Sequence, residues 1–159
     1  MLLKRAEETP KKALPRLNPR DFRGKSWQTR PRPEIDRVGS AWLIRKFIDP
    51  QAKFVFASAP PWRSGLIPFD MVDVEFSHHG DRCTFETLTY RFAIDDKPVH
   101  KIGEMIHDAD LDDAKFQRVE CIGIDRVLKG WGKSGMGDDE ILTAGLECFD
   151  GLYEFLQRR

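Results

Sequence analysis

The sequence predicts an α+β fold with about five helices packed around a small sheet in a single domain, and three observations predict it. A chain of 159 residues is most simply one domain, and its 40% hydrophobic residues suffice for one core. Several long stretches carry apolar residues at the spacing of amphipathic helices. Two shorter runs, at 53–57 and 71–76, have the length and apolar content of strands.

The first 25 residues differ in composition from the rest. They hold eight Lys/Arg and three Asp/Glu, and Pro10 and Pro15 interrupt any helical pattern, which predicts a flexible basic N-terminal tail. Residues 26–159 form the predicted folded domain, with 18 Lys/Arg and 23 Asp/Glu. A mildly acidic body is not the basic footprint of a nucleic-acid-binding domain, so we expect no nucleic-acid binding by this chain alone.

The expected location is the cytoplasm. Three cysteines with no C-x-x-C spacing argue for a reducing compartment and against a disulfide framework. No apolar run approaches the roughly 18–20 residues of a membrane span. The first ten residues also lack the apolar middle region of a secretory signal.

The first half of the folded region predicts one helix and both strands. Residues 38–48 form a largely apolar helix, bracketed by prolines before it and by Asp49-Pro50 after it. The strands at 53–57 and 71–76 follow, joined by a loop that includes residues 65–68.

The second half is predominantly helical. Asp81 is expected to cap a helix over 82–92, and Pro98 suits the first turn of a helix over 98–107. A further helix is predicted over residues 114–129. A glycine-rich loop over 130–137 joins it to the long amphipathic helix that begins at Asp138.

All four histidines lie within one window of thirty residues that is also rich in carboxylates. Imidazoles and carboxylates bind divalent metal ions and transfer protons near neutral pH. From this window we predict a divalent metal site, with the ligands His79, Glu86, His107 and Asp110 or a subset of them. Neighbouring residues of a strand point to opposite faces, so only one of the two adjacent histidines can face a pocket.

Other residues of the region are expected to line the same pocket. Glu104 lies three residues before His107, on the same helical face, in the Glu-x-x-His spacing of known metal sites. Asp36, Cys83 and Asp108 complete the predicted lining. The alternatives are structural: a histidine that completes a helix C-terminus, histidines at a surface turn, and a cysteine that is a small buried apolar group rather than a reactive thiolate.

A second predicted set consists of arginines near helix starts. Guanidinium groups there are suited to oxyanions such as phosphate, sulfate or chromate. The candidates are Arg30, Arg37, Arg45 and Arg82. The alternative is that each arginine pairs with a nearby carboxylate.

Several strings resemble the ChrB-type chromate-resistance domain, over about residues 26–158. They are Trp27-x-Thr-Arg30, Pro33-x-Ile-Asp-Arg37, Ser40-Ala-Trp-Leu-Ile-Arg-Lys-Phe-Ile-Asp-Pro50, Gly80-Asp-x-Cys-Thr-Phe-Glu86 and His107-Asp-Ala-Asp-Leu111. Members of that family are associated with chromate-resistance operons. Longer members resemble chromate-responsive regulators, and others carry the domain beside a rhodanese-like domain.

The resemblance implies a context of chromate or oxyanion stress, with rhodanese-like or chromate-transport operon proteins as partners. Two hypotheses remain open at this point. In one, the domain binds a divalent metal, with Asp36 and Arg37 lining the pocket. In the other, it is a non-catalytic sensor or transcriptional regulator that binds chromate directly through the arginines.

Overall fold

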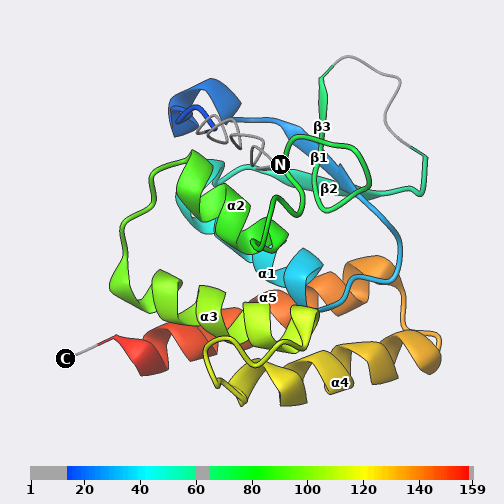
Figure 1. Cartoon of the computed structure of the whole chain (residues 1–159). Coiled ribbons are helices and arrows are strands. Elements are labelled where there is room, and N and C mark those ends of the chain that lie inside the picture. The colour runs from blue at the N-terminus through cyan, green and yellow to red at the C-terminus, as the bar shows by residue number, and fades with distance from the viewer. Residues whose placement is uncertain (1–13, 60–64, 158–159) are drawn as a thin grey trace, which may run out of the picture.

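The computed structural model describes residues 14–59 and 65–157 (Figure 1). In chain order the elements are the 3-10 helix η1 (Pro19–Phe22), β1 (Ser26–Thr29), α1 (Ile35–Leu43), the π-helical turn η2 (Ile44–Ile48), β2 (Lys53–Phe56), β3 (Leu66–Pro68), α2 (Thr84–Arg91), α3 (Lys97–Leu111), α4 (Glu120–Lys133) and α5 (Asp138–Leu156). Five α-helices and a small sheet confirm the predicted α+β fold.

The sheet has three strands in the order β2-β1-β3, and both pairs are parallel. Trp27 on the central strand lies opposite Phe54 and Ile67 and is fully buried. Parallel neighbours need a long connection, and between β1 and β2 this connection is α1 with η2. The arrangement places the C-terminal ends of β1 and β3 next to the start of α1.

The prediction of a strand over 71–76 is wrong. Within the described residues this segment makes a single bridge, between Phe69 and Phe76, and the strand lies instead at Leu66–Pro68, in the predicted loop. Asp70 and Asp73 have φ angles of 50° and 58°, which turn the chain out of the extended conformation that a strand requires. The short strand β1 was not predicted either.

The predicted helices are confirmed, with different ends. Asp81 does not cap α2; the N-cap is Cys83, whose backbone N–H donates to the Glu86 side chain at 3.1 Å. α3 continues to Leu111 and ends because the next residue, Asp112, has a left-handed φ of 50°. Residues 107–110 therefore lie inside the helix rather than beyond it. α4 begins at Glu120 and extends through the first half of the predicted glycine-rich loop.

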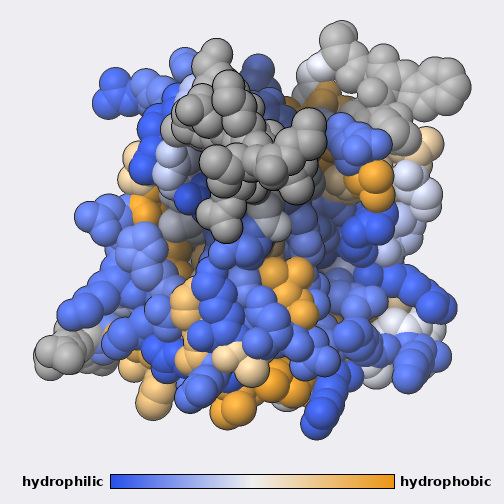
Figure 2. Space-filling view, viewed as in Figure 1, coloured by the Kyte–Doolittle hydropathy of each residue, from blue (hydrophilic) through white to orange (hydrophobic). Residues whose placement is uncertain are grey.

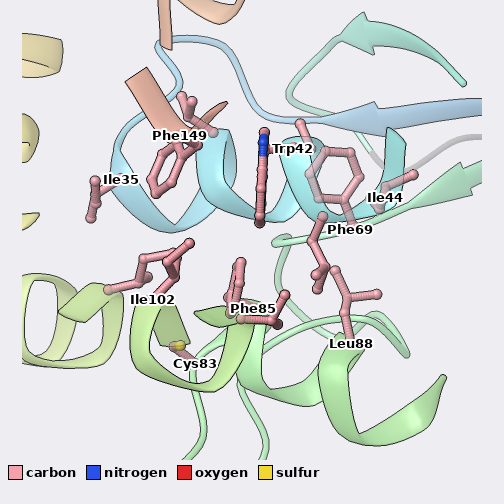
Figure 3. Close-up of a cluster of buried hydrophobic side chains, with 14 of the residues drawn as sticks. Ile35, Trp42, Ile44, Phe69, Cys83, Phe85, Leu88, Ile102 and Phe149 are labelled. Carbon is pink, nitrogen blue, oxygen red and sulfur yellow. The ribbon is translucent and has the colours of Figure 1, made fainter. Parts of the chain in front are cut away.

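The first helix α1 lies at the centre of the molecule and packs against all four other α-helices (Figure 1). Figure 3 shows Ile35 and Trp42 of α1 facing Phe85 of α2 and Ile102 of α3, with the Phe149 ring of α5 beside them. The α1–α5 contact requires a glycine, because a Cβ atom on Gly145 would lie 2.5 Å from Val38 Cγ1.

Residues 14–25, which precede the predicted boundary at residue 26, pack against this body. The buried Arg91 donates from Nε to the Pro15 carbonyl, and Leu17 N–H donates to the Arg91 carbonyl. Phe22 packs against Trp27 and Phe76. Residues 1–13 of the predicted tail lie outside the described residues.

The face in Figure 2 is mainly hydrophilic, with apolar side chains gathered near its lower edge. Among the described residues, none of the helices has the length and apolar character needed to cross a membrane.

Candidate functional site

The buried carboxylate of Asp36 joins α1 to α2. It lies in the first turn of α1 and accepts hydrogen bonds from the backbone N–H groups of Thr84 and Phe85, both at 2.9 Å. These are N–H groups of the first turn of α2, which have no partner within that helix. The carboxylate therefore satisfies the helix start while it remains next to the polar loop that precedes α2.

Three aspartates converge on one imidazole nitrogen in that loop. Nε2 of His78 lies 3.1 Å from Asp36 Oδ2, 3.2 Å from Asp110 Oδ2 and 3.7 Å from Asp70 Oδ1. Asp36 comes from α1, Asp70 from the turn after β3 and Asp110 from the last turn of α3. We call these four residues the aspartate–histidine cluster.

The carboxylates of this cluster favour a positively charged partner, as the pKa values of His78 and Asp36 show. Hydrogen bonds with Asp110 and Asp36 raise the pKa of His78 to about 10, so the ring is a cation at neutral pH. Burial raises the pKa of Asp36, and the charges of Asp70 and Asp110 raise it further. The His78 shift follows from two carboxylates held close to its ring, and the Asp36 shift follows mainly from burial.

Asp70 is held in place by both α1 and α2. Its carboxylate accepts from Thr84 Oγ1 at 2.8 Å and from Arg37 Nε at 3.0 Å, while its backbone carbonyl accepts from Arg30 Nε at 3.2 Å. A hollow of about 260 Å³ opens beside it and is lined by Arg30, Asp70 and His78 among others. A small ligand can thus reach the cluster from solvent.

A second group, the His107 cluster, lies at the start of α2 on the side of α3. It comprises Cys83, Glu86, His107 and Asp113. Nδ1 of the fully buried His107 contacts Glu86 Oε1, and its Nε2 lies 2.8 Å from Asp113 Oδ2. Burial opposes a charge on His107, but the hydrogen bonds with Glu86 and Asp113 raise its pKa.

Cys83 is fully buried in this second cluster. Burial raises the pKa of its thiol well above 9.0, and the nearby charges of Asp36 and Glu86 add to the shift. A raised pKa disfavours the thiolate, which is the reactive form. The geometry therefore favours the structural interpretation of Cys83, as a small buried group that caps α2.

The four predicted metal ligands do not form one group. Glu86 and His107 lie in the His107 cluster, and Asp110 lies in the aspartate–histidine cluster. His79 belongs to neither of them: its Nε2 lies 2.6 Å from the Glu75 carbonyl.

The four predicted oxyanion ligands are also separated. Arg30 and Arg37 both contact Asp70. Arg45 donates to the Ala52 carbonyl and lies over the Phe54 ring. Arg82 lies over the Tyr90 ring.

Two residues of the predicted lining have structural partners. Glu104 pairs with Arg118 at 3.3 Å, and Asp108 accepts the backbone N–H groups of Phe116 and Arg118, which fixes the segment before α4. Asp36, the other acidic residue predicted for the lining, lies in the aspartate–histidine cluster. Sequence reasoning missed His78 and Asp70 as members of that cluster.

Comparisons with known proteins agree with the strings found in the sequence. A family model described as the ChrB C-terminal domain matches residues 27–156. Protein ChrB of Cupriavidus metallidurans is 36% identical over 142 residues, which is 88% of this chain. The match covers 43% of that relative, so the chain spans less than half of its length. No solved structure matches the chain significantly.

Proposed function

The chain belongs to the ChrB C-terminal domain family, and we propose that it acts in chromate resistance as a domain that binds a divalent cation. The observation that carries the proposal is the convergence of Asp36, Asp70 and Asp110 around Nε2 of His78. One oxygen each from Asp36 and Asp110 and one nitrogen from His78 lie within 4.8 Å of one another, as the ligands of one ion must.

Charge supports a cation at this cluster. Three carboxylates face one imidazolium and the guanidinium of Arg37, so one negative charge has no counterpart within the group. Uncompensated charge is costly in the buried environment of Asp36 and Asp70, which are 2% and 7% exposed. A divalent cation that displaces the proton of His78 would, together with Arg37, neutralise the three carboxylates.

The ligand chemistry favours a hard or borderline ion such as Mn²⁺. Carboxylate oxygens suit Mg²⁺ and Mn²⁺, while one imidazole favours a transition metal over Mg²⁺. The His107 cluster is the weaker candidate, because both ring nitrogens of His107 already have carboxylate partners and the Cys83 thiol is held protonated.

A small anion such as chromate is the proposed ligand of the hollow beside the cation. Arg30 lines it, and Arg37 contacts the lining residue Asp70, so both guanidinium groups would offset part of the anion's charge. The contact between Arg37 and Asp70 would then hold the guanidinium in position. Operon proteins of the rhodanese-like or chromate-transport type are the proposed partners.

The alternative proposal is a non-catalytic sensor or regulator that binds chromate through arginines alone. The positions of two of the four predicted arginines favour this alternative, since Arg30 and Arg37 both contact Asp70. Calorimetric titration with chromate in the presence of a chelator separates the two proposals. Chromate affinity that survives chelation supports the sensor, and affinity that is lost supports the metal-dependent domain.

We further infer a cytoplasmic setting. Cys83, Cys121 and Cys148 are all free thiols, and free thiols persist in reducing compartments.

The adjacent histidines provide a matched test of the metal site. Mn²⁺ binding to the chelator-treated full chain is measured by equilibrium dialysis with elemental analysis, for the wild type and for the His78→Ala and His79→Ala variants. We expect about one equivalent in the wild type, a loss of affinity of about tenfold or more in His78→Ala, and no change in His79→Ala. Equal affinity of the two variants would contradict the proposed site.

A further inference from the structure

A cavity of about 730 Å³ is lined by residues of α2, of α3 and of the segment that joins them. Its lining includes Arg16 of the N-terminal arm, Arg82 and Tyr90 from α2 and the loop before it, and Ile94, Val99 and Phe116. We call it the α2–α3 pocket. None of the aspartate–histidine cluster lines it, so it is separate from the proposed cation site.

Two guanidinium groups meet at one aromatic ring of this pocket. The Cζ atoms of Arg16 and Arg82 lie 3.9 and 4.2 Å from the centroid of the Tyr90 ring. Arg16 also donates to the Tyr90 carbonyl at 2.6 Å, and neither arginine forms an ion pair with a carboxylate of the described residues. Two like charges held at one ring without a carboxylate partner favour the approach of an anion.

The rest of the pocket sets the size and shape of that anion. Ile94 and Phe116 are half-buried and offer an apolar surface beside the arginines; the fully buried Val99 also lines the cavity. The cavity volume falls within the range of roughly 300–1,000 Å³ found for small-molecule sites. A tetrahedral inorganic oxyanion would fill only a small part of it and leave this apolar surface uncovered.

Acidic side chains in the lining limit the charge of the ligand. Glu86, Asp95 and Glu104 also face the pocket, so a multiply charged anion would meet repulsion away from the arginines. We propose that the α2–α3 pocket binds an organic monoanion with an apolar ring-bearing body. Its carboxylate or sulfonate lies at Arg82 and Arg16, and its body lies against Ile94 and Phe116.

A matched pair of probes tests the charge and the body separately. The full chain, labelled with ¹⁵N, is titrated with 2-naphthoate and with the neutral 2-naphthamide, and the amide shifts of Thr89, Gly103 and Phe116 are followed. We expect saturable binding of naphthoate with shifts at these amides, and binding of naphthamide that is weaker by about tenfold. Equal affinities, or shifts elsewhere only, would overturn the proposal.

A matched pair of variants tests the arginine. Arg82→Ala is expected to weaken naphthoate binding by about tenfold, while Arg126→Ala, which removes an exposed charge on α4, leaves it unchanged. Circular dichroism confirms that both variants are folded. An identical effect of the two substitutions would contradict the site. Displacement of naphthoate by sulfate at a similar concentration would also overturn it, because the ligand would then be an inorganic oxyanion.

Discussion

Oδ2 of Asp36 lies 3.1 Å from Nε2 of His78 and, on its other side, 2.9 Å from the backbone nitrogen of Thr84. One buried oxygen atom thus connects α1, the first turn of α2 and the loop that precedes it. The candidate site and the packing of the first two helices depend on the same carboxylate, so ligand binding and stability are expected to change together.

A cation at the aspartate–histidine cluster is expected to stabilise the fold. At a Mn²⁺ concentration about 100 times its dissociation constant, the free energy of unfolding should rise by about 2.7 kcal/mol. Asp110→Asn should remove most of this increase, because Asp110 Oδ2 is one of the converging oxygens. Urea denaturation with and without Mn²⁺ measures it, and Asp112→Asn is the control since Asp112 lies outside the cluster. An unchanged increase in Asp110→Asn would exclude Asp110 as a ligand.

Asp49 is expected to make stability depend on pH in the acid range. Burial opposes its charge, but hydrogen bonds from the backbone N–H groups of Gly24 and Lys25, both at 2.8 Å, lower its pKa below 3.8. A carboxyl with a lowered pKa in the folded state stabilises the fold above its pKa in the unfolded chain. That contribution is lost as the pH falls through the folded-state pKa.

Asp49→Asn should therefore lower the free energy of unfolding by about 1–3 kcal/mol at pH 7, and by less as the pH falls below about 4. Urea denaturation across this pH range checks the difference between the wild type and the variant. Glu147→Gln, an exposed change on α5, should show no comparable trend. A constant difference at every pH would show that the charge of Asp49 makes no contribution.

Substitution by alanine at two glycines inside helices should change the stability of the fold in opposite directions. Gly145→Ala places a Cβ atom 2.5 Å from Val38 Cγ1, so α1 and α5 must move apart, at a cost of about 1–3 kcal/mol. Gly123→Ala meets nothing within 4 Å and should stabilise α4 by about 0.5–1 kcal/mol. Thermal unfolding of both variants tests the pair; a stabilised Gly145→Ala would mean that the α1–α5 contact is looser than described.

Two phenylalanines of α5 provide a similar contrast in burial. Phe149 is fully buried against Trp42, whereas Phe155 is 83% exposed. Phe149→Ala should lower the free energy of unfolding by about 3–5 kcal/mol, and Phe155→Ala should change it by no more than about 0.5 kcal/mol. Chemical denaturation measures both, and similar losses would show that α5 buries a different face.

The helices were predictable because their apolar spacing is repeated over several turns. The sheet was less so: β1 and β3 have only four and three residues, too few to show a period. The segment at 71–76 has the apolar content of a strand but is turned by the left-handed backbone of Asp70 and Asp73. Aspartate adopts this conformation less often than glycine does, so it is a weaker signal for such a turn.

The candidate site was predictable as a region and less so as a set of residues. The crowding of histidines and acids predicted that two polar segments meet, and Glu86 of α2 and His107 of α3 are in contact. The choice between His78 and His79 could not be made from alternation, since the loop they occupy is not a strand. Asp70 was missed because its position depends on β3, and Asp36 was assigned to the pocket lining because its distance in sequence hides its contact with α2.

The guanidinium of Arg91 determines where this domain can be shortened. It is buried, and it depends on the Pro15 carbonyl twelve residues before the start of the family match at Trp27. A fragment that begins at Trp27 would lack Pro15, so the buried Arg91 would keep Glu75 as a partner but lose the Pro15 carbonyl. It would also lack Phe22 and so expose the rings of Phe76 and Phe92. Such a fragment is expected to aggregate, although it contains every residue that the family model recognises.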